Sequence, residues 1–167
     1  MSRRVAAHWR TRSTKCRGVY GRTVGNATLL AGIRQDISPH SDTYAVIGVQ
    51  GNVGTRLGWE SYAFVSKEGD LTGEAQVIYQ LPITSRLYLE PRVGLGWSAQ
   101  AVAADAVRSG FTAGEGTLRL RYRLTKKANI YTALVHERLL GGTRRLVRDQ
   151  GDAVQSTVVA IGFGFSL

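Results

Sequence analysis

Residues 86–97 read RLYLEPRVGLGW, and their side chains alternate between two kinds. One kind is apolar, as in Leu87 and Val93, and the other is charged, tyrosine or glycine, as in Glu90. Because successive side chains of a β-strand point to opposite faces, the segment is predicted to be one strand with an apolar face and a charged face. Pro91 fits less well, since proline cannot donate a hydrogen bond to a neighbouring strand.

The same alternation recurs along most of the chain. It is clear in residues 71–81, 117–124 and 156–167, and weaker in residues 27–37, 43–51, 56–66 and 128–137. A partial strand is expected at residues 17–23, which gives eight strands and a ninth that looks cut short. No segment of ten or more residues has the period of a helix, so the chain is predicted to be all-β.

The connections between these segments alternate in length. Short ones lie at residues 23–26, 52–55, 82–84 and 125–127, and longer ones at residues 38–42, 67–70, 98–114 and 138–153. Outer-membrane barrels show this asymmetry, with tight periplasmic turns at one rim and longer extracellular loops at the other. The pattern predicts an antiparallel up-and-down transmembrane β-barrel of at least eight strands, incomplete at its N-terminus.

Aromatic side chains on the apolar face support the membrane interpretation. Trp59, Tyr79, Tyr122 and Phe165 fall near the short-turn rim, and Trp97 falls near the opposite rim. Amphipathic rings prefer the membrane interface, so these five residues are predicted to form two aromatic girdles. Strands of about 9–13 residues also suit a tilted crossing of the bilayer.

The opposite face carries charges of both signs, which are predicted to form a salt-bridged network inside the barrel. These residues are Glu60, Glu74, Arg86, Glu90, Arg92, Glu115, Arg119, Arg121, Arg123 and Glu137. A soluble small-ligand-binding β-barrel, with its charged face in water and its apolar face inside, stays open as the alternative.

The formal net charge of +10 is concentrated at the N-terminus. Residues 1–22 hold seven basic and no acidic side chains, so the rest of the chain has a net charge of only +3. We therefore divide the chain into a basic leader at residues 1–16, disordered or not native to the fold, and a barrel domain at residues 17–167. The leader lacks the apolar core of a secretion signal. Nucleic acid is not an expected partner, because the arginines of the barrel alternate with apolar residues and face glutamates.

No arrangement typical of an enzyme occurs in the sequence. There is no GxSxG, HExxH, GxxxxGK[ST] or EF-hand pattern, and nothing brings Ser98, His136 and Glu137 together as a catalytic set. The chain is therefore not expected to be an enzyme.

Several blocks of the sequence, in this order, resemble the copper resistance protein B family of bacterial outer-membrane proteins. They are residues 29–36 (LLAGIRQD), 43–51 (TYAVIGVQG), 63–76 (AFVSKEGDLTGEAQ), 87–92 (LYLEPR), 117–122 (TLRLRY) and 131–142 (YTALVHERLLGG). The resemblance implies a protein of the outer membrane of Gram-negative bacteria that takes part in copper tolerance, by binding and sequestering the metal or moving it outward. Its implied partners are outer-membrane lipid, copper ions and the barrel-assembly machinery. A generic structural barrel is the alternative within the membrane class.

The chain departs from that family in three ways. It carries neither a secretion signal nor the family's methionine- and histidine-rich N-terminal region. It lacks the additional strands that family members have before the point where residue 17 aligns, and it ends in leucine where the family tends to end in an aromatic residue. Its only methionine is Met1. We therefore expect an N-terminally truncated member of the family, which as written carries no recognisable signal for export.

Copper ligands are scarce in this chain. Copper prefers thiolate, thioether or imidazole ligands, and the candidates are Cys16, Met1, His8, His40 and His136. No two of them have ligand spacing within a strand, so no tightly bound cofactor is expected and the metal site is unknown. His40 is a weak candidate in an extracellular loop, and the interior glutamates are expected to attract cations without selecting copper.

Overall fold

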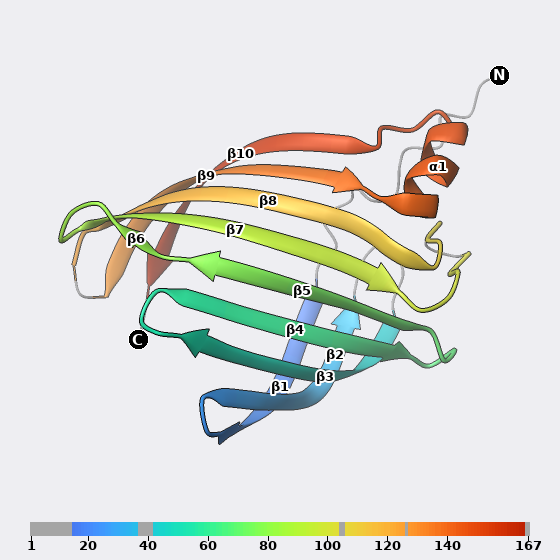
Figure 1. Cartoon of the computed structure of the whole chain (residues 1–167), viewed down its shortest axis with the longest axis horizontal. Helices are drawn as coiled ribbons and strands as arrows, with labels where there is room; N and C mark the ends of the chain where they lie inside the picture. The colour runs from blue at the N-terminus through green and yellow to red at the C-terminus, as the bar shows by residue number, and fades with distance from the viewer. Residues whose placement is uncertain (1–14, 37–41, 104–105, 126, 166–167) are drawn as a thin grey trace.

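A computed structural model describes residues 15–36, 42–103, 106–125 and 127–165 of the chain. One antiparallel sheet of ten strands dominates these residues, with a single short helix at one end (Figure 1). The elements are β1 (Lys15–Val24), β2 (Ala27–Asp36), β3 (Asp42–Val53), β4 (Leu57–Ser66), β5 (Leu71–Tyr79), β6 (Leu81–Pro82), β7 (Leu87–Ser98), β8 (Gly110–Arg123), β9 (Ala128–Leu139), α1 (Gly141–Asp149) and β10 (Gln155–Phe165).

Neighbours in the chain are also neighbours in the sheet. The order is β1-β2-β3-β4-β5-β7-β8-β9-β10, and the two-residue β6 pairs with the start of β7. The predicted all-β, antiparallel, up-and-down arrangement is confirmed. β1 and β10 are the two edges of this sheet, and within the described ranges no strand pairing joins them.

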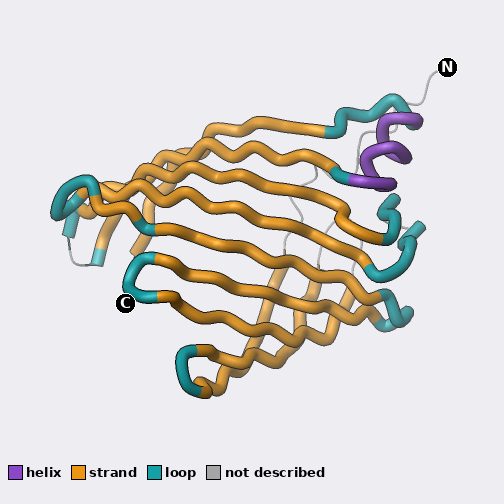
Figure 2. Tube along the Cα trace, viewed as in Figure 1, coloured by secondary structure: helices purple, strands orange, loops and turns teal. Residues whose placement is uncertain are grey.

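The connections alternate between two rims (Figure 2). The short-turn rim holds tight turns such as those at Gly25 and Gly54, whose φ angles of 61° and 64° favour glycine. The long-loop rim holds the connection from β7 to β8 and the connection from β9 to β10 that contains α1. The predicted alternation of short and longer connections matches the structure except between β5 and β7. That connection, residues 80–86, contains β6 and is longer than the one at residues 67–70 on the opposite rim. β10 ends at the short-turn rim.

Three elements differ from the sequence-based prediction. β1 is a full strand of ten residues and not a fragment, and β8 begins at Gly110, seven positions before the strand expected from the alternation. A register shift between Gly96 and Trp97 and the glycines of residues 110–116 break the pattern there. α1 occupies part of an expected loop, because nine residues are too few to show a clear helical period.

Helix α1 is positioned by its contacts with the long-loop rim and not by a side-chain cap at its N-terminus. Its N-cap residue, Leu140, provides no side-chain hydrogen bond, and its first turn contains no acidic residue. Thr143 and Val147, one helical turn apart, are buried, and the backbone N–H of Arg108 donates to Thr143 Oγ1 at 2.9 Å. Among the described residues, no helix is long and apolar enough to cross a membrane.

The sheet curls strongly toward one of its faces. Arg17 on β1 reaches Glu74 on β5 at 3.0 Å, although the two strands are four places apart in the sheet. In a flat sheet that separation would be roughly 19 Å. Figure 1 accordingly shows the first strands passing behind the central ones. We call the concave side, which carries Arg17 and Glu74, the inner face, and the other side the outer face.

The outer face is apolar and exposed, the reverse of an ordinary soluble domain. Ile161 is 85% exposed and Ile47 is 68% exposed. Every long strand exposes at least one valine, leucine or isoleucine side chain, and on β1, β4 and β5 valine is the one type of the three that is exposed. The inner face holds the small core, in which Leu30, Val46, Tyr62 and Phe64 pack together.

Candidate functional site

The inner face collects nearly all of the charged residues that were predicted to face a barrel interior. Strand pairing places nine of the ten on this one face, because Glu60 lies opposite Gln76, Glu90 opposite Arg119, and Glu115 opposite Glu137. The tenth, Arg86, lies in the turn that precedes β7, where its carbonyl oxygen accepts a hydrogen bond from the backbone N–H of Arg123. Arg92 follows Glu90 on the same side of β7 and is half-buried.

Glu90 is the centre of a basic cluster near the short-turn rim. It is only 7% exposed, and its carboxylate lies 2.5 Å from Arg121 Nη2 and 4.0 Å from Arg119 Nη1. The Arg119 guanidinium stacks over the Tyr131 ring at 4.7 Å, and Tyr88 lies beneath Arg121 and Arg123 at 5.5 and 4.8 Å. The arginines of this cluster carry more positive charge than the single carboxylate balances. Cation–π contacts with the tyrosine rings stabilise the remaining guanidinium charge.

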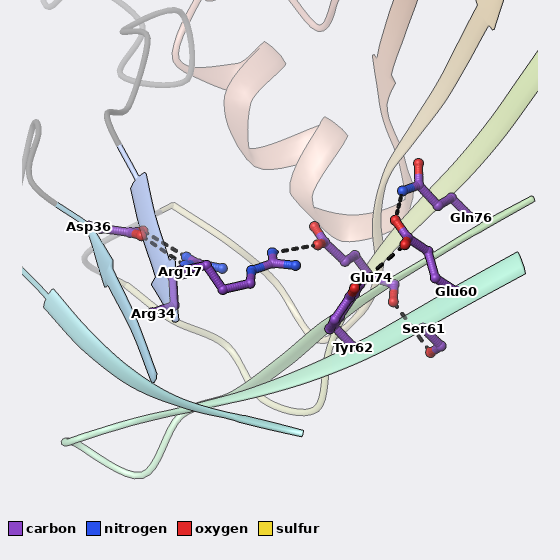
Figure 3. A network of polar contacts seen from close by, with 8 residues as sticks. All are labelled: Arg17, Arg34, Asp36, Glu60, Ser61, Tyr62, Glu74 and Gln76. Atoms are coloured by element: carbon purple, nitrogen blue, oxygen red, sulfur yellow. Dashed lines mark hydrogen bonds and ion pairs between the residues drawn. The ribbon is translucent and has the colours of Figure 1, made fainter. Parts of the chain in front are cut away.

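A second network joins the N-terminal strands to the middle of the sheet (Figure 3). Arg17 Nη2 donates to Glu74 Oε1 at 3.0 Å while its guanidinium lies 4.4 Å from the centre of the Tyr62 ring. Arg34 makes a bidentate pair with Asp36, with both N–O distances at 2.7 Å. Two arginines therefore cover the small aromatic core of the inner face.

Glu60 is held by neutral donors in the same network. Gln76 Nε2 donates to one oxygen of Glu60, and the Tyr62 hydroxyl lies 3.5 Å from the other (Figure 3). Among the described residues, no guanidinium forms an ion pair with this carboxylate.

A cavity of about 220 Å³ adjoins the second network on the inner face. Its lining includes four carboxylates, from Glu60, Glu74, Glu115 and Glu137. Glu115 and Glu137 lie directly opposite each other on β8 and β9, and the Thr117 hydroxyl donates to Glu115 at 2.9 Å. Carboxylates gathered in a partly enclosed space create a negative potential that attracts cations.

The geometry of the described residues does not assemble a metal centre. Within those ranges no group of three or more histidine, cysteine, aspartate or glutamate side chains is placed to hold an ion. Cys16 is a free, exposed thiol on β1, and His136 lies exposed on β9, where it makes a hydrogen bond to Thr157 Oγ1 at 2.8 Å. His40 lies outside the described residues, as do Met1 and His8.

The five aromatic residues predicted for the membrane interface lie on strands, at positions that belong to the outer face. Trp59 and Trp97 each cover a glycine directly opposite on the neighbouring strand, Gly51 and Gly73 respectively. Tyr79 ends β5, and Tyr122 and Phe165 are exposed near the short-turn rim. The Phe165 ring meets the Phe163 ring edge-on, with centroids 4.8 Å apart.

Sequence reasoning missed the contribution of the first strand to this site. Arg17 was counted with the basic N-terminal charge, yet it lies in β1 and reaches the centre of the inner face. The available signal was its place at the start of the partial strand expected at residues 17–23, on the same face as Val19 and Gly21. Tyr62, Tyr88 and Tyr131 were also missed, because a ring beneath a guanidinium leaves no mark in a single sequence.

The chain is similar to known proteins over most of its length. A family model described as copper resistance protein B precursor matches residues 5–166. The chain is 27% identical over 155 residues to the copper resistance protein B homolog of Pseudomonas syringae pv. tomato, covering 92% of this chain and 53% of that protein. It is 29% identical over 154 residues to copper resistance protein B of Escherichia coli, covering 91% of this chain and 52% of that protein.

The chain thus spans about half the length of the curated relatives it matches. The family match, in contrast, extends over almost the whole of the present sequence. On this basis the chain belongs to the copper resistance protein B family.

Proposed function

We propose that this sheet is the wall of an outer-membrane β-barrel that contributes to copper tolerance and is not an enzyme. The observation that carries the proposal is the reversed polarity of the sheet, with Glu90 buried on the inner face and Ile161 exposed on the outer face. In a membrane barrel, apolar side chains face lipid while polar side chains fill the interior. The proposed partners during insertion are outer-membrane lipid and the barrel-assembly machinery.

The extent of the apolar surface also supports a lipid-facing role. Soluble monomers rarely expose continuous apolar patches of more than a few hundred Å², since such patches cause association in water. Here exposed aliphatic side chains follow one another across neighbouring strands, from Ile33 on β2 and Ile47 on β3 to Leu134 on β9 and Val159 on β10. The apolar acyl chains of lipid match the polarity of this surface.

The copper role is supported by the names of the relatives and by the acidic cavity. Carboxylates are hard ligands and do not select copper over other divalent ions. We therefore assign Glu60, Glu74, Glu115 and Glu137 the task of concentrating cations electrostatically inside the barrel. We attribute the selective binding of copper, and its sequestration or outward movement, to the whole protein.

Heat-modifiable migration tests the membrane part of the proposal. The chain, exported behind a signal peptide, is expected in the outer-membrane fraction and soluble only with detergent. Unboiled samples are expected to migrate differently from boiled ones on a denaturing gel. A monomer that remains soluble without detergent would overturn the proposal in favour of a soluble ligand-binding barrel.

Copper sensitivity tests the second part. A strain that lacks the gene is expected to grow poorly on copper, and the complementing gene is expected to restore growth. Glu115→Gln with Glu137→Gln is expected to restore it less well, because these two neighbouring carboxylates both line the cavity. Glu68→Gln with Asp149→Asn, which removes the same charge outside the cavity lining, is the matched control. Full rescue by both double variants would refute the role of the cavity.

A further inference from the structure

The long-loop rim carries a group of arginines that the barrel interior does not use. We call it the rim cluster, and its members are Arg108, Arg138, Arg144, Arg145 and Arg148. The two connections that hold the cluster also contain Asp105, Asp149 and Asp152, so its five arginines keep an excess of positive charge. Among the residues that the structure describes, no carboxylate forms an ion pair with any member of the cluster.

Arg144 lies near enough to two other members of the cluster to be affected by their charge. Partial burial, followed by the nearby guanidinium groups of Arg138 and Arg148, lowers the pKa of Arg144. Arg144 Nε is buried and has no hydrogen-bond partner within the described ranges. The fold therefore holds cations together without supplying the counter-charge that would relieve their repulsion.

The helix fixes this arrangement in place. Burial of Thr143 and Val147 sets the rotation of α1, so Arg144 and Arg148, each one position further on, share one face of the helix. Arg108 is tied to the first turn through its N–H bond to Thr143, and its Cβ lies close to Gly142. The cluster is consequently a feature of an ordered rim and not of a loose tail.

The position of Arg138 shows which surface the cluster continues. Along the outer face of β9, exposed Leu134 is followed by His136 and then by Arg138. On β10 the neighbouring series runs from exposed Val159 through Thr157 to Gln155. The outer face thus changes from apolar to polar to basic toward α1, which lies at the same end of the sheet as the end of β7 (Figure 1).

From this juxtaposition we propose that the rim cluster binds phosphate-bearing lipid headgroups of the leaflet that faces the long-loop rim. This inference rests on the proposed membrane function, because the headgroup layer adjoins the hydrocarbon that the outer face would contact. Basic side chains at the edge of an apolar surface extend to the headgroups while their stems stay in the apolar layer. Juxtamembrane arginines are attracted by anionic lipid, and each one strengthens binding about fivefold.

Lipid-dependent stabilisation of the full chain in neutral detergent tests the proposal. Phosphatidylglycerol, added to the micelles, is expected to raise the unfolding midpoint more than phosphatidylcholine does. Arg144→Gln with Arg148→Gln is expected to raise the half-saturating phosphatidylglycerol concentration roughly 25-fold. Lysine at both positions is expected to retain most of the effect, since headgroup attraction depends mainly on charge.

The matched control removes two arginines from the opposite rim. Arg22→Gln with Arg56→Gln changes the net charge by the same amount. Both residues are exposed and lie next to short turns. An equal loss of affinity in this control, or an equal response to phosphatidylcholine, would overturn the proposal. Inorganic phosphate that reproduces the stabilisation at the same concentration would assign the cluster to free phosphate instead.

Heat-modifiable migration of each variant separates this inference from the proposed function. A chain that shows the shift in detergent but no preference for anionic lipid disproves only the headgroup site. A chain that never shows the shift disproves the barrel itself. If only the double glutamine variant loses the shift, the double lysine variant is compared with the unchanged chain instead. A double lysine variant that shows the shift but has no preference for anionic lipid would also overturn the site.

Discussion

Arg17 and Glu74 lie 57 positions apart in the chain, and their side chains meet at 3.0 Å across the inner face. β1 and β5 are separated by three other strands, so this contact exists only because the sheet curls. The Arg17 guanidinium also lies 4.4 Å from the Tyr62 ring on β4. One arginine at the edge of the sheet therefore interacts with two strands near its centre.

A double-mutant cycle should show that Arg17 does more than pair with Glu74. The side chains are 30% and 50% exposed, so solvent screens the pair and we expect a coupling energy below about 1 kcal/mol. Arg17→Gln should cost more free energy of unfolding than Glu74→Gln, because only the first also removes the contact with Tyr62. Urea unfolding of the four proteins in detergent measures both quantities, and equal costs for the two single variants would contradict the stacking role.

Glu90→Gln is expected to be the most destabilising of the inner-face carboxylate substitutions. The buried carboxylate pairs with Arg119 and Arg121, and without it their charges lose this counter-charge and keep their tyrosine ring contacts. Removing one member of a fully buried pair costs about 3–5 kcal/mol, and partial exposure of both arginines reduces this to about 2 kcal/mol. Glu115→Gln is the matched control, because Glu115 is exposed and accepts a hydrogen bond from Thr117. Equal unfolding midpoints for the two variants would contradict the prediction.

The fold was largely predictable because a strand has the shortest and most regular sequence period. Alternation in residues 86–97 fixes which side chains share a face, and the observed pairing of Glu90 with Arg119 follows from that alternation and from connection length. Curvature leaves no such periodic mark, so the Arg17–Glu74 contact was not predictable. Helix α1 was missed for a related reason, since Thr143 and Val147 alone define its buried face.

Gly73→Ala is expected to destabilise the sheet on its outer face. The Trp97 ring lies over Gly73 on the neighbouring strand, and a Cβ at position 73 would overlap that ring. Displacing a packed ring costs about 1–3 kcal/mol. Gly116→Ala is the control, because Gly116 also lies on the outer face and has nothing within 4 Å of an added Cβ. Chemical unfolding should therefore separate the two variants, and restoration of stability by adding Trp97→Leu to Gly73→Ala would identify the ring as the cause.

Arginine substitutions along one strand should reveal whether the outer face lies in lipid. Ile47 and Val53 both lie on the outer face of β3, at its middle and at its short-turn end, and they are 68% and 61% exposed. In water, arginine at either position would change stability little, because both side chains already face solvent. In a bilayer the cost of arginine is about 2–4 kcal/mol at the midplane and falls to about 0–1 kcal/mol near the interface. We therefore expect Ile47→Arg to lower the free energy of unfolding in phospholipid vesicles far more than Val53→Arg does. The same pair of variants in a short-chain detergent should differ less, because a thin micelle lets the guanidinium reach water. Equal and small effects in vesicles would place the outer face in water and would contradict the membrane function, whatever the gel migration shows.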